Sequence, residues 1–284
     1  MTTKIAIQGY PGSFHDEVCQ QYFGSDVDVV PCSTFDKLGH RLHANEVDFA
    51  IMAIENSIAG TILQNYRILR EQSLHIIGER NLRIKHNLLT YQDTDISDIE
   101  EIHSHPMAIN QCLTFLNQYP SIKLVESEDT ALSAKRIQEK QNCKIASISS
   151  TAAANLYDLH VMAEGIEDNP VNYTRFLVLS NQQKTINKGA NKASIYIRIP
   201  DVKGQLLRVL QLIDIHDLNM SKLQSFPVMG KLREYFFHLD IEFDSVDSYH
   251  LLKTDLQAIT HEFTELGTYK SDPIFSIHET PSSI

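Results

Sequence analysis

A hydroxyl and a guanidinium stand at the start of an otherwise apolar, strand-like run. Thr174 and Arg175 come directly before Phe176, which leads into Leu-Val-Leu, and an apolar strand needs neither polar group in order to fold. One interpretation is a surface strand whose arginine is solvated. The other is a hydrogen-bond donor beside an anion-binding cation, at the mouth of a strand where α/β proteins commonly bind ligands. The stretch alone leaves both interpretations open.

Polar side chains also follow a second apolar run. The predicted strand 49–54 is followed directly by Glu55, Asn56 and Ser57. The carboxyl ends of strands are where the ligand crevices of α/β sheets form. Asparagine and serine at this position could instead be turn and capping residues. A carboxylate that ends an apolar strand, however, requires a partner or water.

Two further turns carry candidate binding groups. Ser13 ends the turn 9–13, which contains two glycines and precedes a predicted helix at 14–23. The turn could bind an anion through backbone N–H groups, or Ser13 could simply cap the helix. The glycine spacing matches neither the dinucleotide-binding pattern nor the P-loop, so no nucleotide site is expected.

Ser104 and Gln111 flank the start of another predicted helix. They are seven residues apart, with the helix expected at 107–119, so Gln111 should face the same side as the helix entrance. His103 and His105 lie nearby, but no acid or cysteine completes a set of metal ligands around them. We therefore expect no metal site.

The order of predicted elements indicates an α/β protein with two lobes. Extended segments at 76–83 and 84–89 are expected to cross between the lobes. The first lobe alternates strands and helices from residue 4 to residue 70, and the second does so from about residue 99 to residue 156. A polar stretch at 181–192 without periodicity is typical of a linker.

The last part of the chain predicts a separate βαββαβ module of the ferredoxin-like type. Leucine, isoleucine and phenylalanine recur at helical spacing through residue 263, which indicates a long final helix with a core-facing side. The predicted strands are 194–199, 220–226, 234–243 and 268–277, and the predicted helices are 204–215 and 248–266.

Composition narrows the classes of function. The chain has 284 residues and a net charge of −11, which argues against general binding to nucleic acid or anionic membranes. Its four cysteines show no close pairing or metal-like spacing, so reduced thiols are expected. There is no apolar run of membrane-spanning length and no signal-peptide core at the start. We expect a cytoplasmic protein.

Several short motifs, taken together and in order, resemble the prephenate dehydratase family. They are Gly12-Ser13-Phe14, the run Ile54-Glu55-Asn56-Ser57-Ile58-Ala59-Gly60, Ser104-His105-Pro106 with Gln111, Thr130-Ala131 with Ala134, Leu156-Tyr157, and Asn172-Tyr173-Thr174-Arg175-Phe176. The resemblance implies a bilobed catalytic domain at 1–183, similar to type II periplasmic binding proteins. It further implies a linker at 184–192 and a C-terminal ACT regulatory domain at 193–278.

The resemblance also implies the reaction and the residues that perform it. The family converts prephenate to phenylpyruvate, carbon dioxide and water in phenylalanine biosynthesis, with no cofactor. Thr174 and Arg175 would be catalytic: the threonine would donate to the departing hydroxyl, and the arginine would pair with a substrate carboxylate. The implied substrate-binding residues are Ser13, Glu55, Asn56, Ser57, Ser104, Gln111, Ser150 and Phe176. No fused chorismate mutase is expected, because the first predicted strand starts at residue 4.

The implied regulatory domain matches its family imperfectly. The motif Gly-Ala-Leu appears as Gly204-Gln205-Leu206, and Glu-Ser-Arg-Pro appears as Gln224-Ser225-Phe226-Pro227. Phenylalanine is the implied effector, bound between paired domains of a homodimer or homotetramer. The effector-binding residues would be Gly204, Gln205, Leu206, Asn219, Met220, Gln224 and Ser225. The altered motifs leave the response to phenylalanine open.

Two alternatives stand beside this interpretation. One is an arogenate dehydratase, whose substrate differs from prephenate in carrying an amino group in place of the keto group. The other is a non-catalytic small-molecule sensor with an ACT module, which would not need the hydroxyl of Thr174.

Overall fold

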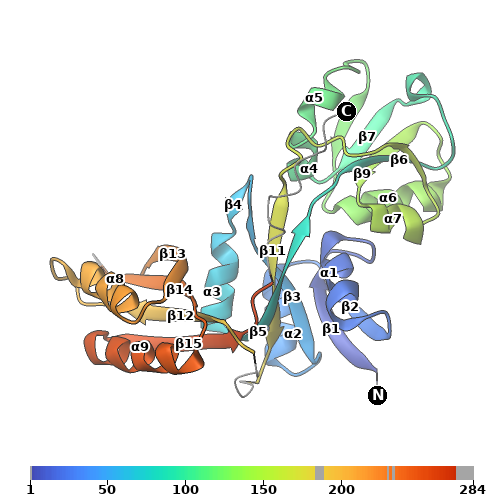
Figure 1. Cartoon of the computed structure of the whole chain (residues 1–284). Coiled ribbons are helices and arrows are strands. Elements are labelled where there is room, and N and C mark those ends of the chain that lie inside the picture. Colours follow the sequence, from blue (N-terminus) through green and yellow to red (C-terminus); the bar gives the residue numbers. More distant parts are fainter. Residues whose placement is uncertain (1, 183–188, 229, 232–233, 273–284) are drawn as a thin grey trace. The chain divides into compact units, whose positions relative to one another are not determined.

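The structure is a computed structural model that describes residues 2–182, 189–228, 230–231 and 234–272 (Figure 1). Its contacts divide the chain into two compact units. Unit 1 comprises residues 1–72 and 80–178, and unit 2 comprises residues 73–79 and 179–284. Residues 184–188 of the predicted linker, and residues 273–278 of the predicted regulatory domain, lie outside the described residues.

The first sheet is built on parallel strands that are buried on both faces. Residues 50–54 of β3 are all buried, which explains why the run is continuously apolar rather than alternating. β1 pairs in parallel with both β2 and β3, and the order is β2-β1-β3-β11-β5, with β4 paired to β3. The strands are β1 (Thr3–Gln8), β2 (Val27–Cys32), β3 (Phe49–Asn56), β4 (Gly60–Thr61), β5 (His75–Arg83) and β11 (Tyr173–Ser180). The helices that follow its strands are α1 (Phe14–Phe23), α2 (Phe35–His43) and α3 (Leu63–Glu71).

The second sheet is mixed. β7 runs parallel to β8 and β9, whereas β6 runs antiparallel to β9 and β10. The strands, in the order β10-β6-β9-β7-β8, are β10 (His160–Ala163), β6 (Asn87–Thr90), β9 (Ile145–Ser149), β7 (Glu101–Ser104) and β8 (Lys123–Glu126). The helical segments are η1 (Ile96–Asp98), α4 (Pro106–Asn110), α5 (Leu113–Leu116), α6 (Thr130–Lys140) and α7 (Thr151–Leu156). The α/β class and the two alternating series agree with the prediction.

One predicted helix of this series is wrong. The segment 107–119 is not continuous, because α4 ends at Asn110 and α5 begins only at Leu113. Cys112 leaves helical geometry, with φ −124° and ψ 19°. Gln111 therefore does not lie two turns along a single helix, as the sequence predicted. Gln111 is instead the residue that ends α4.

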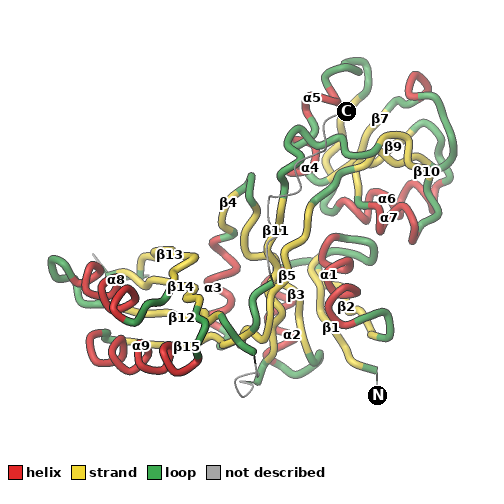
Figure 2. The backbone as a smooth tube through the Cα atoms, in the orientation of Figure 1, coloured by secondary structure: helices red, strands yellow, loops and turns green. Residues whose placement is uncertain are grey.

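Unit 2 contains a four-stranded antiparallel sheet with two helices (Figure 2). Its elements are β12 (Lys192–Arg198), α8 (Gln205–Ile215), β13 (Asn219–Pro227), β14 (Tyr235–Glu242), α9 (Val246–Ile259) and β15 (Glu262–Tyr269). The strand order is β13-β14-β12-β15. Ile195, Ile197 and Leu239 pack with Val209 and Leu252 in one core. The βαββαβ order is the predicted one.

The end of this module differs from the prediction. The final helix stops at Ile259, and residues 262–266, which were predicted to belong to it, are part of the last strand, which spans 262–269. Thr260 has φ −106° and ψ 150°, which is extended backbone. Phe263 lies at helical spacing from Ile259, which is why the helix was predicted to continue. It is instead a strand residue that pairs with Ile197 of β12. Long-range pairing thus overrode the local pattern.

Candidate active site

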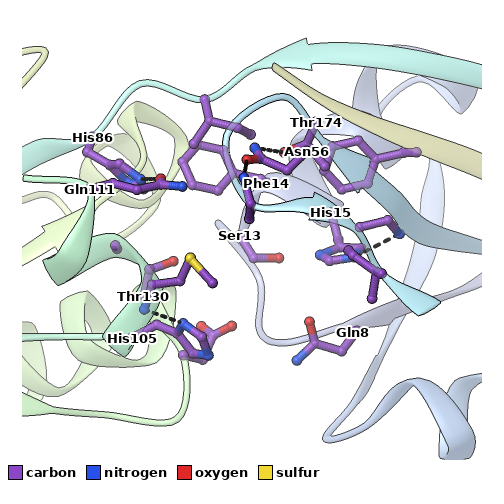
Figure 3. Close-up of a pocket in the computed structure, with 18 of the residues that line it drawn as sticks. Gln8, Ser13, Phe14, His15, Asn56, His86, His105, Gln111, Thr130 and Thr174 are labelled. Atoms are coloured by element: carbon purple, nitrogen blue, oxygen red, sulfur yellow. Dashed lines mark hydrogen bonds between the residues drawn. The ribbon is translucent and has the colours of Figure 1, made fainter. Parts of the chain in front are cut away.

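A cavity of about 300 Å³ opens in unit 1, among segments that are far apart in the sequence (Figure 3). This volume suits a small-molecule ligand. Five of the predicted site residues line it, namely Ser13, Asn56, Gln111, Thr174 and Phe176. The fold brings them together from a turn after β1, the end of β3, the end of α4 and the start of β11.

Strand order explains why Asn56 and Thr174 meet. β3 and β11 are neighbours in the first sheet, and Asn56 is the last residue of β3 while Thr174 is the second of β11. The Asn56 amide nitrogen lies 3.0 Å from Thr174 Oγ1. Residues 118 positions apart in the chain therefore share one hydrogen bond at the cavity wall.

Two backbone amides fix the orientation of the Asn56 side chain. Its Oδ1 accepts hydrogen bonds from the N–H groups of Ile58 at 2.9 Å and Ala59 at 2.8 Å. Because a backbone N–H can only donate, the oxygen must face the turn, and Nδ2 must face the start of β11. From there Nδ2 donates to Thr174 Oγ1, and also to Asn172 Oδ1 at 2.7 Å.

This orientation is passed on to the next amide. Since Asn172 accepts at Oδ1, its Nδ2 is the donor, and it reaches Gln111 Oε1 at 2.9 Å. Gln111 Oε1 also lies 3.0 Å from Nε2 of His86. We call this run of side chains, from Asn56 through Asn172 to Gln111 and His86, the amide ladder.

The amide ladder leaves the Thr174 hydroxyl as a donor. Thr174 is 8% exposed, and its Oγ1 already accepts the hydrogen bond from Asn56. A hydroxyl has one proton to give, and no acceptor for that proton is found among the described side chains bonded to Thr174. The arrangement therefore presents an O–H donor to whatever occupies the cavity.

Three predicted serines have their hydroxyls engaged elsewhere. Ser104 is fully buried and donates to the carbonyl of Ile148 at 2.7 Å. Ser57 donates to the Val171 carbonyl at 3.0 Å and accepts from Tyr173 N–H at 2.9 Å, which ties the turn after β3 to the start of β11. Neither these two serines nor the third, Ser150, lines the cavity. Their contact with substrate remains a prediction.

The third of these, Ser150, fastens the turn 9–13 to α7. Its Oγ donates to the Gly12 carbonyl at 2.6 Å and accepts from Ala153 N–H at 2.9 Å, and Tyr157 Oη donates to the Pro11 carbonyl at 2.8 Å. Gly12 has φ +85°, and a Cβ there would lie 3.0 Å from Ala153 Cα. Glycine is required both by the left-handed backbone and by the close approach of α7.

Arg175 and Glu55 are not among the residues that line the cavity. Side chains alternate along a strand, and Thr174 and Phe176 both line the cavity, so Arg175 between them belongs to the opposite face of β11. The described residues of the lining include no lysine or arginine. Pairing of Arg175 with a substrate carboxylate stays a prediction, because Arg175 is not among the residues that line the cavity.

A comparison with models of protein families shows which family the chain belongs to. The model of the family described as prephenate dehydratase matches residues 5–184. The chain belongs to the prephenate dehydratase family. It is 32% identical over 288 aligned residues to the bifunctional chorismate mutase/prephenate dehydratase of Escherichia coli K12, covering 98% of this chain and 74% of that protein.

Other relatives of the family bear on substrate and structure. Arogenate dehydratase/prephenate dehydratase 1 of Arabidopsis thaliana is 30% identical, over 95% of this chain and 72% of its own length. The solved prephenate dehydratase of Arthrobacter aurescens, in complex with L-Phe, has a TM-score of 0.84 at 28% identity, with 94% and 90% of the two chains covered. GqqA, described as a novel type of quorum quenching acylase, has a TM-score of 0.85 at 27% identity, with 95% and 98% covered.

Sequence reasoning missed five titratable residues of the cavity as site residues: His15, His86, His105, Glu128 and Asp129. Burial lowers the pKa of His15 to about 3; its ring keeps some exposure but lies edge-on to Phe176, 5.0 Å between ring centroids. Burial also lowers the pKa of His86, against the opposing effects of Gln111 and Glu167. Both rings are therefore neutral near pH 7.

Asp129 was predicted only as a helix cap, and the structure confirms that cap. Its Oδ1 accepts from Leu132 N–H at 2.9 Å at the start of α6. Burial raises the pKa of the carboxyl, while the hydrogen bonds from the Leu132 and Ala131 amides oppose the shift. No local signal distinguishes such a cap from any other, because only the tertiary fold brings the start of α6 to the cavity.

No cluster of three or more histidine, cysteine, aspartate or glutamate side chains is arranged to hold a metal ion in the part of the chain that the structure describes. Within the same residues, no helix combines the length and the apolar character needed to cross a bilayer.

Replacing Asn56 by aspartate tests the amide ladder. The carboxylate would still accept from the Ile58 and Ala59 amides, but it could no longer donate to Thr174 or Asn172. The Thr174 proton would turn toward the new carboxylate and away from the substrate, so we expect dehydratase kcat to fall about 10²-fold, measured by steady-state kinetics. Asn169→Asp is the matched control, because Asn169 is exposed and only accepts, from Val171 N–H. Wild-type turnover in Asn56→Asp would contradict the ladder.

The lowered histidine pKa values predict acid sensitivity. Unfolded histidine titrates near 6.5, whereas His15 and His86 stay neutral to lower pH in the folded protein. Below about pH 6.5 the unfolded state thus binds more protons, and the free energy of unfolding should fall by up to about 1.4 kcal/mol per pH unit for each ring. Denaturant unfolding between pH 7 and pH 5 measures this slope. His15→Gln should reduce this slope. An unchanged slope would show that His15 does not have a lowered pKa in the folded protein.

Proposed function

We propose that this chain is a prephenate dehydratase that converts prephenate to phenylpyruvate, carbon dioxide and water in L-phenylalanine biosynthesis. The observation that carries the proposal is the Thr174 hydroxyl, held as a donor by Asn56 at the wall of the cavity in unit 1. Family membership supports the substrate class, and the hydrogen bond from Asn56 supports the role of Thr174 as a donor.

The reaction needs a leaving-group donor more than it needs an electron sink. The bond between the ring and its carboxylate breaks, and its electron pair enters the ring as the C–O bond to the hydroxyl breaks. The hydroxyl takes up a proton and departs as water, and the ring becomes aromatic. Thr174 donates to that oxygen as it acquires negative charge, a role that contributes about 10²–10⁴-fold in general acid catalysis.

Neutral donors hold the rest of the substrate in this proposal. Gln111 uses Oε1 as an acceptor twice, so its Nε2 can donate to a substrate oxygen. The first turn of α1, with Ser13 and Phe14 at the cavity, brings the positive end of a helix dipole toward a carboxylate. Arg175 is proposed as a carboxylate partner from the family motif alone.

The geometry favours a donor over a nucleophile, which separates this proposal from acyl transfer. An activated nucleophilic hydroxyl gives its proton to an adjacent base. The described partner of Thr174 Oγ1 is instead the Asn56 amide, which donates to it. The activity described for GqqA is therefore not proposed for this chain.

We propose the domain roles on the same basis. Residues 1–183 would form the catalytic domain, bilobed like type II periplasmic binding proteins, and 184–192 the linker. Residues 193–278 would form an ACT regulatory domain, as the βαββαβ order supports. Pairing of ACT domains would make the enzyme a homodimer or homotetramer. The cytoplasmic location stays a prediction.

Phenylalanine is the proposed effector. Unit 2 has a cavity of about 210 Å³ whose lining includes the predicted residues Gly204, Gln205 and Leu206, together with Asp201. The relative from Arthrobacter aurescens was solved with L-Phe. The predicted residues on β13, namely Asn219, Met220, Gln224 and Ser225, do not line this cavity in the single chain. In the proposal a second copy of the module brings them to the effector.

Gln205, which stands where the family motif has alanine, makes a hydrogen bond within unit 2. Its side chain is 6% exposed, and Nε2 donates to the Ile259 carbonyl at 2.8 Å. The amide is thereby tied to the end of α9, and Gln205 remains one of the residues that line the cavity. Titration calorimetry of the whole protein with phenylalanine should show saturable binding, and prephenate turnover should fall as the site fills. Absence of both would remove the effector from the proposal.

Substitution of Thr174 tests the catalytic role. Thr174→Val removes the hydroxyl and keeps the shape, so kcat should fall about 10²–10⁴-fold while the melting temperature changes little. Thr174→Ser is the matched control that restores a donor, and it should recover much of the rate. Assays with prephenate and arogenate side by side, following phenylpyruvate and phenylalanine, identify the substrate. A wild-type protein inactive on both would be the sensor instead, and an active Thr174→Val would end the assignment.

A further inference from the structure

His15 is the second residue of α1, and its ring lines the cavity in unit 1. Two aromatic rings pack against it. Phe176 meets it edge-on, with 5.0 Å between centroids and an interplanar angle of 88°, and the centroid of Phe35 lies 5.5 Å away. In Figure 3 the ring lies between Thr174 and Gln8. The imidazole therefore has a fixed place at the cavity wall.

A backbone amide determines which ring nitrogen of His15 carries the proton. The N–H of Ala53, in β3, lies 3.4 Å from Nε2. A backbone N–H can only donate, so Nε2 is the acceptor. Burial lowers the pKa of the ring to about 3, so the ring is neutral near pH 7 and has its one proton on the other nitrogen. Nδ1 of His15 is therefore an N–H donor.

This donor is accessible and has nothing to donate to. The hydrogen bond from Ala53 is the one that the His15 side chain makes among the described residues. The side chain is partly exposed, and Nδ1 is not among the polar atoms that are shielded from solvent without a partner. Because the ring lines the cavity, an acceptor on a bound molecule can reach Nδ1.

The place of His15 along β11 indicates which part of the substrate it meets. Thr174 and Phe176 both line the cavity and lie two residues apart on one face of the strand, a span of about 7 Å. His15 packs against the second of them. In prephenate the hydroxyl and the ring carboxylate stand on opposite carbons of the six-membered ring. A substrate whose hydroxyl meets Thr174 can thus direct its ring carboxylate toward His15.

We propose that the Nδ1–H group of His15 donates a hydrogen bond to the ring carboxylate of prephenate, the group that leaves as carbon dioxide. The inference rests on the proposed dehydratase function and adds a substrate-binding residue at the end of the substrate opposite Thr174. In this role His15 neither takes up nor gives up a proton during the reaction.

A neutral donor suits a carboxylate that has to leave. The carboxylate loses its negative charge as its electron pair enters the ring, so a bond to that charge is weaker in the transition state than in the bound substrate. A cationic partner would oppose this loss of charge more strongly than a neutral ring N–H does. The described lining contains no lysine or arginine, and His15 supplies a donor without a charge.

Two substitutions of His15 separate its nitrogens. Asparagine can place an amide donor near the position of Nδ1, whereas glutamine can place an acceptor near the position of Nε2 and leaves Nδ1 unreplaced. Because the bond weakens as the carboxylate leaves, its loss should raise KM and not lower kcat. KM for prephenate should be at least about tenfold higher in His15→Gln than in His15→Asn, the scale of one hydrogen bond to a charged group. Equal KM values, the reverse order, a fall in kcat alone, or two inactive folded variants would overturn the proposal.

Nitrogen-15 NMR tests the contact with the histidine intact. In the free wild-type protein, His15 should show a protonated Nδ1 and an unprotonated Nε2. With Thr174→Val, which slows turnover, prephenate should shift the Nδ1–H resonance as the bond to the carboxylate forms. Para-hydroxyphenylpyruvate keeps the hydroxyl and the side chain of the substrate but lacks the ring carboxylate, so it should leave this resonance nearly in place.

Three results of the NMR experiment would contradict the inference. They are a protonated Nε2 in the free protein, no shift with prephenate, and equal shifts with the two compounds at concentrations at which each occupies the site.

The wild type distinguishes this inference from the function beneath it. A wild-type protein that does not turn over prephenate contradicts the dehydratase proposal itself. An active wild type with the reverse order of His15 variants contradicts only the role of Nδ1.

Discussion

The hydrogen bonds from two backbone amides to Asn56 Oδ1 are the constraint on which the site depends. They are made by the turn that follows β3, so the polarity of the side chains in the cavity is set by the backbone of the first sheet. Every later donor and acceptor in the ladder is determined in sequence by that first choice. An amide that could flip would leave Thr174 as likely to accept as to donate.

The amide and hydroxyl groups of the site act through the direction of their hydrogen bonds, beside the carboxyl groups of Glu128 and Asp129. The described lining of the site lacks lysine and arginine, and burial keeps the rings of His15 and His86 neutral. As the C–O bond breaks, negative charge develops on the departing oxygen, and neutral donors already oriented toward that oxygen need no rearrangement during the reaction. Burial of the polar groups strengthens each of these bonds.

Much of this could be predicted from the sequence, because local patterns carry it. Alternation of strands and helices predicted the α/β class, and the polar residues after β3 and at the start of β11 predicted Asn56 and Thr174. What local patterns cannot show is which strands become neighbours. That limit explains why His86 and the site role of Asp129 were missed, since both reach the cavity only through tertiary packing. It also explains the misplaced end of α9, where pairing of Phe263 with β12 outweighed helical spacing.

The contact of Gly12 with α7 limits the size of the side chain that the turn beside the cavity can carry at position 12. Ser150 and Tyr157 donate to two carbonyl groups, those of Gly12 and Pro11, next to a position where a methyl group would lie only 3.0 Å from Ala153 Cα. Any larger residue there would act as a wedge between the turn and the helix. The missing Cβ of Gly12 thus lets the turn lie close to α7, and this close approach helps to fix the position of the neighbouring Ser13 at the cavity.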